Sequence, residues 1–216
     1  MLILKWFFGG LLTLFFLHLA VLRLVRHLFP FPAPAFATRL IDNPFRRRFI
    51  QNPDIIAARM GLAPGMTVLD IGPGKGSYTL AVAERVRSGG TVYAVDIQEA
   101  VIRRLRQRLE KERVINIIPQ LEDVYHLSFA DESFDRVLMV ACLPEIPEKG
   151  RALREIRRVL KPEGFLCLCE LFPDPDYPLR RTEKKWAEAA GLELKQEYGN
   201  WFTYQLHFGK SPGFGA

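Results

Sequence analysis

The sequence has few cysteines and no spacing of them that points to a framework. Its 216 residues contain three, Cys142, Cys167 and Cys169. A small odd number argues against a secreted disulfide scaffold. Cys167 and Cys169 share one face of an apolar segment, and no further cysteine or suitably spaced histidine completes a metal set. We therefore expect no metal site and assign both residues to the core.

Acidic residues are scarce near the N-terminus. Residues 1–60 hold eight Lys and Arg residues against two acidic ones, while the remaining chain holds 22 of each sign, so the first segment carries the whole net charge of +6. A nucleic-acid-binding domain would more often carry such an excess on its own folded surface, so we expect no nucleic-acid partner. A basic block beside an apolar segment suits an anionic membrane surface instead.

Residues 6–22 form an apolar run whose only polar members are Thr13 and His18. Extended to residue 28, the run reaches the ~20 residues that a bilayer core demands. We therefore expect residues 1–28 to be an N-terminal hydrophobic membrane-anchor helix. The basic residues that follow it place the rest of the chain in the cytoplasm. Two alternatives stay open: a monotopic helix lying in the headgroup plane, and a signal peptide cleaved near Ala35 and Ala37.

The remaining chain divides into a linker, a domain and a tail. Alternate prolines make residues 29–42 an extended spacer, residues 43–209 form the domain, and residues 210–216 form a loose tail. Within the domain, short apolar runs alternate with longer amphipathic ones, which predicts an α/β fold whose mostly parallel sheet has helices on both faces. The expected strands are 67–71, 91–96, 114–119, 134–141, 164–171, 192–198 and 201–208, the last two forming an antiparallel hairpin. The expected helices are 77–87, 99–111, 148–160 and 179–190.

A glycine-rich turn lies where the first expected strand ends. Residues 68–76 read Val-Leu-Asp-Ile-Gly-Pro-Gly-Lys-Gly, and glycines let a ligand approach the backbone closely. No Lys-Ser/Thr pair follows the last glycine, which excludes a phosphate-cradling P-loop. Asp70 does not suit a phosphate, but its carboxylate suits an ammonium group. Alone, this turn is compatible with a dinucleotide, a nucleotide or only a tight turn.

Three further segments resemble class I S-adenosylmethionine-dependent methyltransferases, in particular the small-molecule and lipid-modifying branch that includes the quinone-biosynthesis enzymes. Residues 92–96 resemble the family's second strand, residues 123–135 its D-A-x-x-L-P-F-x-D-x-S-F-D segment, and residues 155–164 its helix-to-fifth-strand signature. The resemblance covers residues 62–172. It implies a Rossmann-like seven-stranded sheet, S-adenosyl-L-methionine as cofactor and methyl transfer as the reaction. Ser128 and Glu163 depart from the pattern at positions that tolerate change.

The resemblance also implies roles for individual residues. Asp70 would reach the cofactor's ammonium, the three glycines would line its amino-acid end, and Asp96 would accept hydrogen bonds from both ribose hydroxyls. Alternatives are a strand-end cap for Asp96 and a solvated loop acid for Asp123. The complete expected cofactor set is Asp70, Gly72, Gly74, Gly76, Asp96, Ile97, Asp123 and Val124, with the last two at the adenine edge.

The catalytic assignment is less specific. Many relatives place His or Asn after the fourth strand, where this chain has Cys142-Leu-Pro-Glu, and Cys142 is either near the methyl donor or a small buried residue. Candidate bases or orienting groups on loops after strands are Tyr125, His126, Glu145, Glu170 and Tyr177. We predict His126, Tyr125 and Glu145 as the catalytic set, and His126 has the most suitable intrinsic pKa for a base. A surface position is the competing interpretation for His126.

The expected anchor indicates the acceptor class. We expect a membrane-anchored methyltransferase with its catalytic domain in the cytoplasm, acting on a small lipophilic acceptor such as a lipid headgroup, a quinone-like ring or a polyprenyl compound. The bilayer itself is the second expected partner, with Arg46, Arg47 and Arg48 facing the headgroups; a solvated charge run is the alternative for these three residues. The alternatives are a non-catalytic membrane-tethered module that binds S-adenosylmethionine or a partner, and an aminopropyl transferase on the same fold. The sequence leaves the oligomeric state open.

Overall fold

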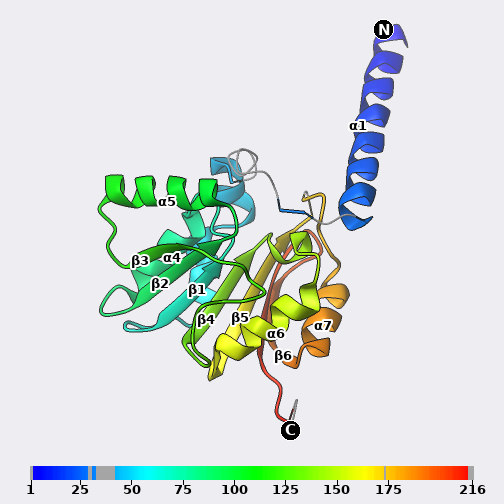
Figure 1. The fold of residues 1–216 in the computed structure, drawn as a ribbon. Coiled ribbons are helices and arrows are strands. Elements are labelled where there is room, and N and C mark those ends of the chain that lie inside the picture. The colour runs from blue at the N-terminus through cyan, green and yellow to red at the C-terminus, as the bar shows by residue number, and fades with distance from the viewer. Residues whose placement is uncertain (1, 29–30, 33–41, 173, 214–216) are drawn as a thin grey trace.

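The central feature of the computed structural model is a seven-stranded sheet with strand order β3-β2-β1-β4-β5-β7-β6 (Figure 1). The structure describes residues 2–28, 31–32, 42–172 and 174–213. The first five strands pair in parallel, and β7 pairs antiparallel with both β5 and β6. The predicted sheet with its antiparallel C-terminal hairpin is therefore confirmed. The strands are β1 (Thr67–Ile71), β2 (Thr91–Asp96), β3 (Ile117–Leu121), β4 (Phe134–Val140), β5 (Leu160–Leu171), β6 (Leu192–Gly199) and β7 (Thr203–Lys210).

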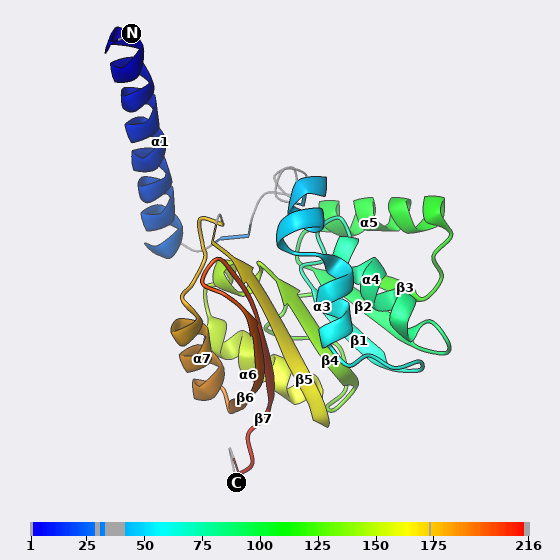
Figure 2. The same ribbon diagram turned by 180° about the vertical axis from the view of Figure 1, so that it is seen from behind.

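Helices cover both faces of the sheet, because successive strand residues point to opposite sides. On β1, Val68 belongs to the core beneath one helical layer and Leu69 to the core beneath the other. Figure 1 shows α6 and α7 in front of the sheet, and the reverse view shows α3 and α4 on the other face (Figure 2). The helices of the domain are α3 (Pro53–Arg59), α4 (Ser77–Val86), α5 (Glu99–Glu112), α6 (Lys149–Val159) and α7 (Arg180–Ala189).

Local sequence signals explain where these elements begin and end. The Asn52 side chain accepts from the backbone N–H of Asp54 at 2.8 Å, and Pro53 occupies the first turn of α3. On α6 the buried residues Ala152, Leu153, Ile156 and Val159 follow the helical period. The strand β5 begins at Leu160, earlier than the expected 164, because Leu160 already pairs with Phe134 of β4.

The N-terminal segment forms one long helix, α1 (Leu2–Leu28), which projects away from the domain. Its described side chains include many large apolar groups exposed to solvent, with Trp6 77 % and Leu14 65 % accessible. Among the described residues, however, no helix combines the length and apolar character needed to cross a bilayer, so the expected transmembrane span is not supported.

The structure bears differently on the predicted linker and the predicted tail. Most of the expected proline-rich spacer at 29–42, with the expected cleavage motif at 35–37, lies outside the described residues. The tail expected from residue 210 begins one residue later, since Lys210 still belongs to β7.

Candidate active site

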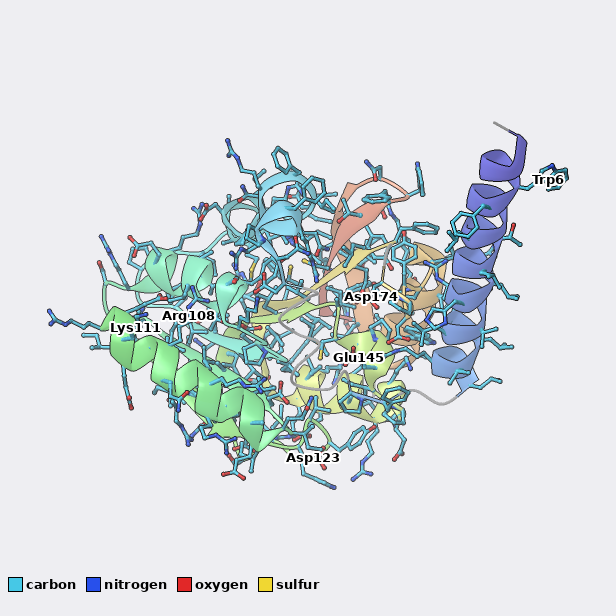
Figure 3. The ribbon with its side chains drawn as sticks, turned by 90° about the horizontal axis from the view of Figure 1, so that it is seen from above. Trp6, Arg108, Lys111, Asp123, Glu145 and Asp174 are labelled. Atoms are coloured by element: carbon cyan, nitrogen blue, oxygen red, sulfur yellow. The ribbon has the colours of Figure 1, made fainter. Side chains whose placement is uncertain are left out.

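A cavity of about 180 Å³ opens at the carboxyl ends of β1 and β4. Between these two strands the strand order reverses, because β1 continues to β2 on one side and pairs with β4 on the other. In open α/β sheets this reversal is the place where ligands bind. Seen from above, Glu145 and Asp174 lie near the middle of this edge and Asp123 lies at its margin, with α5 to one side and α1 to the other (Figure 3).

The glycine turn forms the inner wall of the cavity. Gly72 has a φ of +73° and donates its N–H to the Val95 carbonyl at 2.9 Å. A Cβ at Gly72 would lie 2.7 Å from the Cys142 Sγ, so the turn leaves no room for a side chain. At Gly74, with a φ of +56°, a Cβ would meet nothing within 4 Å, which leaves the backbone open to the cavity. Gly76 has another function: it begins α4 and packs against Leu105.

Asp70 lies at the bottom of the cavity and is 2 % exposed. Its carboxylate accepts a hydrogen bond from the Thr79 hydroxyl at 2.5 Å. Burial raises the pKa of Asp70 to about 7, since a low-dielectric site disfavours the charged form, and the hydrogen bond from Thr79 opposes this shift. A cationic group placed beside this carboxylate would offset the cost of its burial.

Asp96 ends β2, the strand that pairs with β1, and also lines the cavity. One carboxylate oxygen accepts from the backbone N–H of Gln98 at 2.8 Å, which is the cap-like contact considered from the sequence. Burial raises the pKa of Asp96 to about 6, and the Gln98 hydrogen bond opposes this shift. The next residue, Ile97, lines the same cavity and is 59 % exposed, so it offers an apolar surface to a flat ligand.

The loop after β3 closes the outer side of the cavity. Asp123, Val124 and Tyr125 all line it. Asp123 accepts from the backbone N–H of Tyr125 at 2.9 Å, which fixes the loop. The Tyr125 hydroxyl accepts from the Glu148 N–H at 3.0 Å, and Arg151 lies over its ring.

The structure does not bring His126 to the cavity. His126 is absent from the cavity lining, and its ring contacts the Arg151 guanidinium. Of the three predicted bases, Tyr125 and Glu145 therefore line the cavity, whereas His126 has the surface position that the sequence also allowed. Cys142 lines the cavity against Gly72, and burial raises the pKa of its thiol well above the usual value.

The last turn of α1 binds the rim of the cavity, a contact that the sequence did not reveal. The Arg26 guanidinium forms ion pairs with Glu145, at 3.0 Å, and with Asp176. Arg23 lies over the Phe172 ring at 4.5 Å and donates to the Phe172 carbonyl. Arg26 and Glu145 are 119 residues apart, so no local pattern connects them.

The last residue of the expected linker, Asp42, and Arg46 a few residues later also line the cavity. Asp42 accepts from the Ser77 hydroxyl at 2.6 Å, and the Lys75 ammonium donates to its carbonyl at 2.7 Å, which ties the segment to the glycine turn. Arg46, in the π-helical turn η1 (Arg46–Ile50), is 5 % exposed and bonds to Gln51. The expectation that Arg46 faces lipid headgroups is therefore wrong, because its guanidinium is held inside the protein.

The remaining predictions concern the cysteines and a possible metal site. Cys167 and Cys169 are buried core residues, as expected. Among the residues that the structure describes, no cluster of three or more His, Cys, Asp or Glu side chains could hold a metal ion.

Comparison with known proteins identifies the class. Residues 62–205, more than half of the chain, match the family described as a methyltransferase domain. The chain belongs to this family, and the expected class, an S-adenosylmethionine-dependent methyltransferase, is confirmed. Its fold is that of a methyltransferase from Aquifex aeolicus described as SAM dependent, with a TM-score of 0.76 over 82 % of this chain and 98 % of that one at 23 % identity.

Two curated relatives are methyltransferases of quinone biosynthesis. The chain is 40 % identical over 111 residues to the ubiquinone/menaquinone biosynthesis C-methyltransferase UbiE of Hydrogenovibrio crunogenus, covering 51 % of this chain and 44 % of the relative. It is 31 % identical over 149 residues to the demethylmenaquinone methyltransferase of Lactiplantibacillus plantarum, covering 68 % and 61 %. An arsenite methyltransferase of Halobacterium salinarum matches at 33 % over 127 residues, covering 59 % and 32 %. The matched segment spans less than half the length of the first and third relatives and 61 % of the length of the demethylmenaquinone methyltransferase.

S-adenosylmethionine fits the cavity. The cofactor has a cationic amino-acid end, a ribose with two hydroxyl donors and a flat adenine. The cavity offers a buried carboxylate at Asp70, an open glycine backbone at Gly74, a second carboxylate at Asp96 and an exposed apolar side chain at Ile97. These chemistries match in kind, and all four residues line the same cavity.

Proposed function

We propose that this protein is a membrane-associated methyltransferase that transfers the methyl group of S-adenosylmethionine to a small lipophilic acceptor, with a quinone-like ring as the first candidate. A lipid headgroup and a polyprenyl compound are the other members of this class. The observation that carries the proposal is the contact between α1 and the cavity: a helix with exposed apolar side chains has Arg26 in its last turn, and Arg26 is paired with Glu145 of the cavity wall. A lipid-soluble acceptor that diffuses along this helix reaches the cavity.

The cofactor would be held by the residues that the family pattern indicated. Asp70 would pair with its ammonium, Gly72 and Gly74 would contact its amino-acid end, and Asp96 would accept from its ribose. The adenine would lie between Ile97 and the loop of Asp123 and Val124. The bound cofactor supplies a methyl group on a sulfonium, which is already an activated leaving group, so the chain must chiefly align the acceptor and exclude water.

The acceptor would enter beside Glu145. This part of the wall combines apolar residues, Val140 and Ile146, with the carboxylates of Glu145 and Asp174. Apolar walls with a few placed polar groups are typical of small-molecule sites. A quinone-like ring has both a flat apolar body and polar oxygens, and methylation at a ring carbon also needs a group that removes a proton. Glu145 and Tyr125 are the candidates that line the cavity.

The named relatives support the quinone-like acceptor. Beside the two described above, a 2-phytyl-1,4-naphtoquinone methyltransferase of Trichormus variabilis is 35 % identical over 146 residues. The arsenite methyltransferase among the matches is the reason to test a soluble acceptor as well. For location, we propose the cytoplasmic surface of a membrane, reached by a monotopic α1 whose apolar side chains enter the headgroup region.

A labelled methyl-transfer assay tests the proposal. Full-length protein is incubated with methyl-labelled S-adenosylmethionine and, in parallel, with a demethylated quinone in vesicles, with phospholipid vesicles and with a soluble extract. Asp96→Asn is the control for the cofactor site, and Ile115→Ala, which changes a 94 % exposed residue far from it, is the matched control. We expect label in the quinone fraction with the wild type and Ile115→Ala. Label in the soluble fraction alone would refute the lipophilic acceptor, and cofactor binding without any transfer would indicate a non-catalytic module.

A further inference from the structure

Exposed aromatic side chains occur as pairs in two parts of the chain that adjoin residues of the cavity lining. Phe45 and Phe49 stand on η1, 65 % and 72 % exposed, with ring centroids 5.2 Å apart. Phe172, directly after β5, and Trp201, between β6 and β7, are 38 % and 70 % exposed, with ring centroids 5.4 Å apart. We call Phe45, Phe49, Phe172 and Trp201 the aromatic rim. A single exposed aromatic needs no explanation, but two pairs from distant segments beside one cavity do.

The two halves of the rim belong to one edge of the molecule. Figures 1 and 2 both show η1, the β6–β7 connection and the base of α1 at the carboxyl end of the sheet. Residues next to each half line the cavity, since Arg46 lies beside Phe45 and Asp174 lies close after Phe172 in the chain. Each aromatic pair therefore adjoins, along the chain, a residue of the cavity lining.

The rim is continuous with α1. Arg23, in the last turns of the helix, stacks on Phe172 and donates to its carbonyl, which fixes the base of the helix against one half of the rim. Exposed apolar side chains then continue along the helix, from Leu24 to Trp6. Arg48 adds an exposed cation beside Phe49, and the first 60 residues carry the whole net charge of +6.

We propose that the aromatic rim is a second membrane contact, which seats the mouth of the cavity on the headgroup layer of an anionic bilayer. Trp and Phe flanked by Arg are the side chains that settle at a membrane–water interface, where the rings reach the acyl boundary and the guanidinium remains with the phosphates. The inference rests on the proposed function, because it explains how an acceptor passes from lipid to the cavity without crossing water.

Tryptophan quenching tests the rim separately from the helix. The chain has three tryptophans. The full-length double variant W6F/W186F leaves Trp201 as the only one, and W186F/W201F leaves Trp6. Each is mixed with vesicles of phosphatidylglycerol and phosphatidylcholine, with and without bromine on the acyl chains. We expect bromolipid to quench Trp201, since its ring would lie at interface depth.

The outcomes separate the rim from the proposed function. Quenching of Trp6 with Trp201 unaffected overturns the rim and leaves the helix as a membrane contact. Quenching of Trp201 supports the rim whether or not any acceptor is methylated. Quenching of neither residue overturns both membrane contacts. A shift of Trp201 emission with protein concentration in the absence of vesicles would show that a second copy covers the rim, which also overturns the proposal.

Substitution gives a second measurement. Phe49→Ala and Trp201→Ala each remove an exposed ring that supports little of the core. Each is expected to lower vesicle partitioning by ~3-fold or more, because burial of a large aromatic side chain in an apolar phase is favourable. Ile115→Ala, which shortens an even more exposed side chain before β3, should leave partitioning unchanged. Equal partitioning of all three variants and the wild type would contradict the proposal.

Discussion

Replacing Asp70 by Asn is expected to stabilise the cofactor-free protein while it weakens cofactor binding. The Asp70 carboxylate is fully buried, and its pKa is raised from 3.8 to about 7 because burial disfavours the charged form. Asn keeps the shape and an oxygen that can accept the hydrogen bond from Thr79, but it carries no charge. The substitution therefore removes the cost of a buried anion together with the partner of the cofactor's ammonium.

The sign and the size of the effect follow from proton linkage. Because the folded state binds the Asp70 proton more tightly than the unfolded state, the wild type loses stability as the pH rises from about 4 to about 7, and the loss is complete above about 7. A shift of about three pKa units corresponds to an upper limit of ~4 kcal/mol. Imperfect accommodation of the Asn amide N–H₂ lowers the expected gain to ~1–3 kcal/mol.

Urea unfolding at pH 5, 6, 7 and 8 measures this directly. The difference in unfolding free energy between Asp70→Asn and the wild type should grow with pH up to about 7 and then stay constant. Saturating S-adenosylmethionine, at about 100 times its Kd, should stabilise the wild type by ~2.7 kcal/mol and the variant far less. A variant that is less stable at every pH, or a difference that does not change with pH, would refute the reasoning.

Three further substitutions examine other parts of the account. Gly72→Ala should reduce both stability and cofactor affinity, because a Cβ there would lie 2.7 Å from the Cys142 Sγ at a φ of +73°; thermal unfolding and a cofactor titration measure the two effects, and an unchanged protein would count against the tight turn. Glu183→Gln should raise the unfolding free energy more at pH 9 than at pH 6. Burial raises the pKa of Glu183 to about 8, so the wild type loses stability as the pH rises towards that value; an effect that does not change with pH would contradict this. Arg26→Ala should release the end of α1, because it removes a partly buried ion pair at a cost of ~1–3 kcal/mol. Amide hydrogen exchange in residues 20–28 should then become faster, and unchanged protection would exclude a role for the pair in docking the helix.

The parts of the site that depend on short stretches of chain could be predicted from the sequence. The glycine turn, Asp70 and Asp96 lie at the ends of two adjacent strands, and a strand–turn–helix pattern is visible within ten residues. The sheet could also be predicted from short stretches of sequence, because strands buried on both faces appear as continuous apolar runs. Element ends were less accurate where pairing with another strand decided them, as with Leu160 in β5.

Contacts between distant segments could not be predicted. Arg26 with Glu145, and Asp42 with Ser77, depend on how the chain returns to the edge of the sheet, and a single sequence carries no signal of such pairs. Charge alone was also misleading for Arg46, since an arginine in a basic run can be buried when a nearby Gln51 accepts from it. His126 was a candidate base because of the usual pKa of a histidine, but that property does not indicate where a side chain lies in the fold.

Calorimetric titration of the full-length protein with S-adenosylmethionine shows whether the cavity binds this cofactor. We expect one site with a Kd in the micromolar range and at least ~10-fold weaker binding for Asp96→Asn, since a hydrogen bond to a charged group contributes ~1.5–3 kcal/mol. Ile115→Ala should bind like the wild type. Absence of binding, or equal affinity for the wild type and Asp96→Asn, would contradict the assignment of the cavity as the cofactor site.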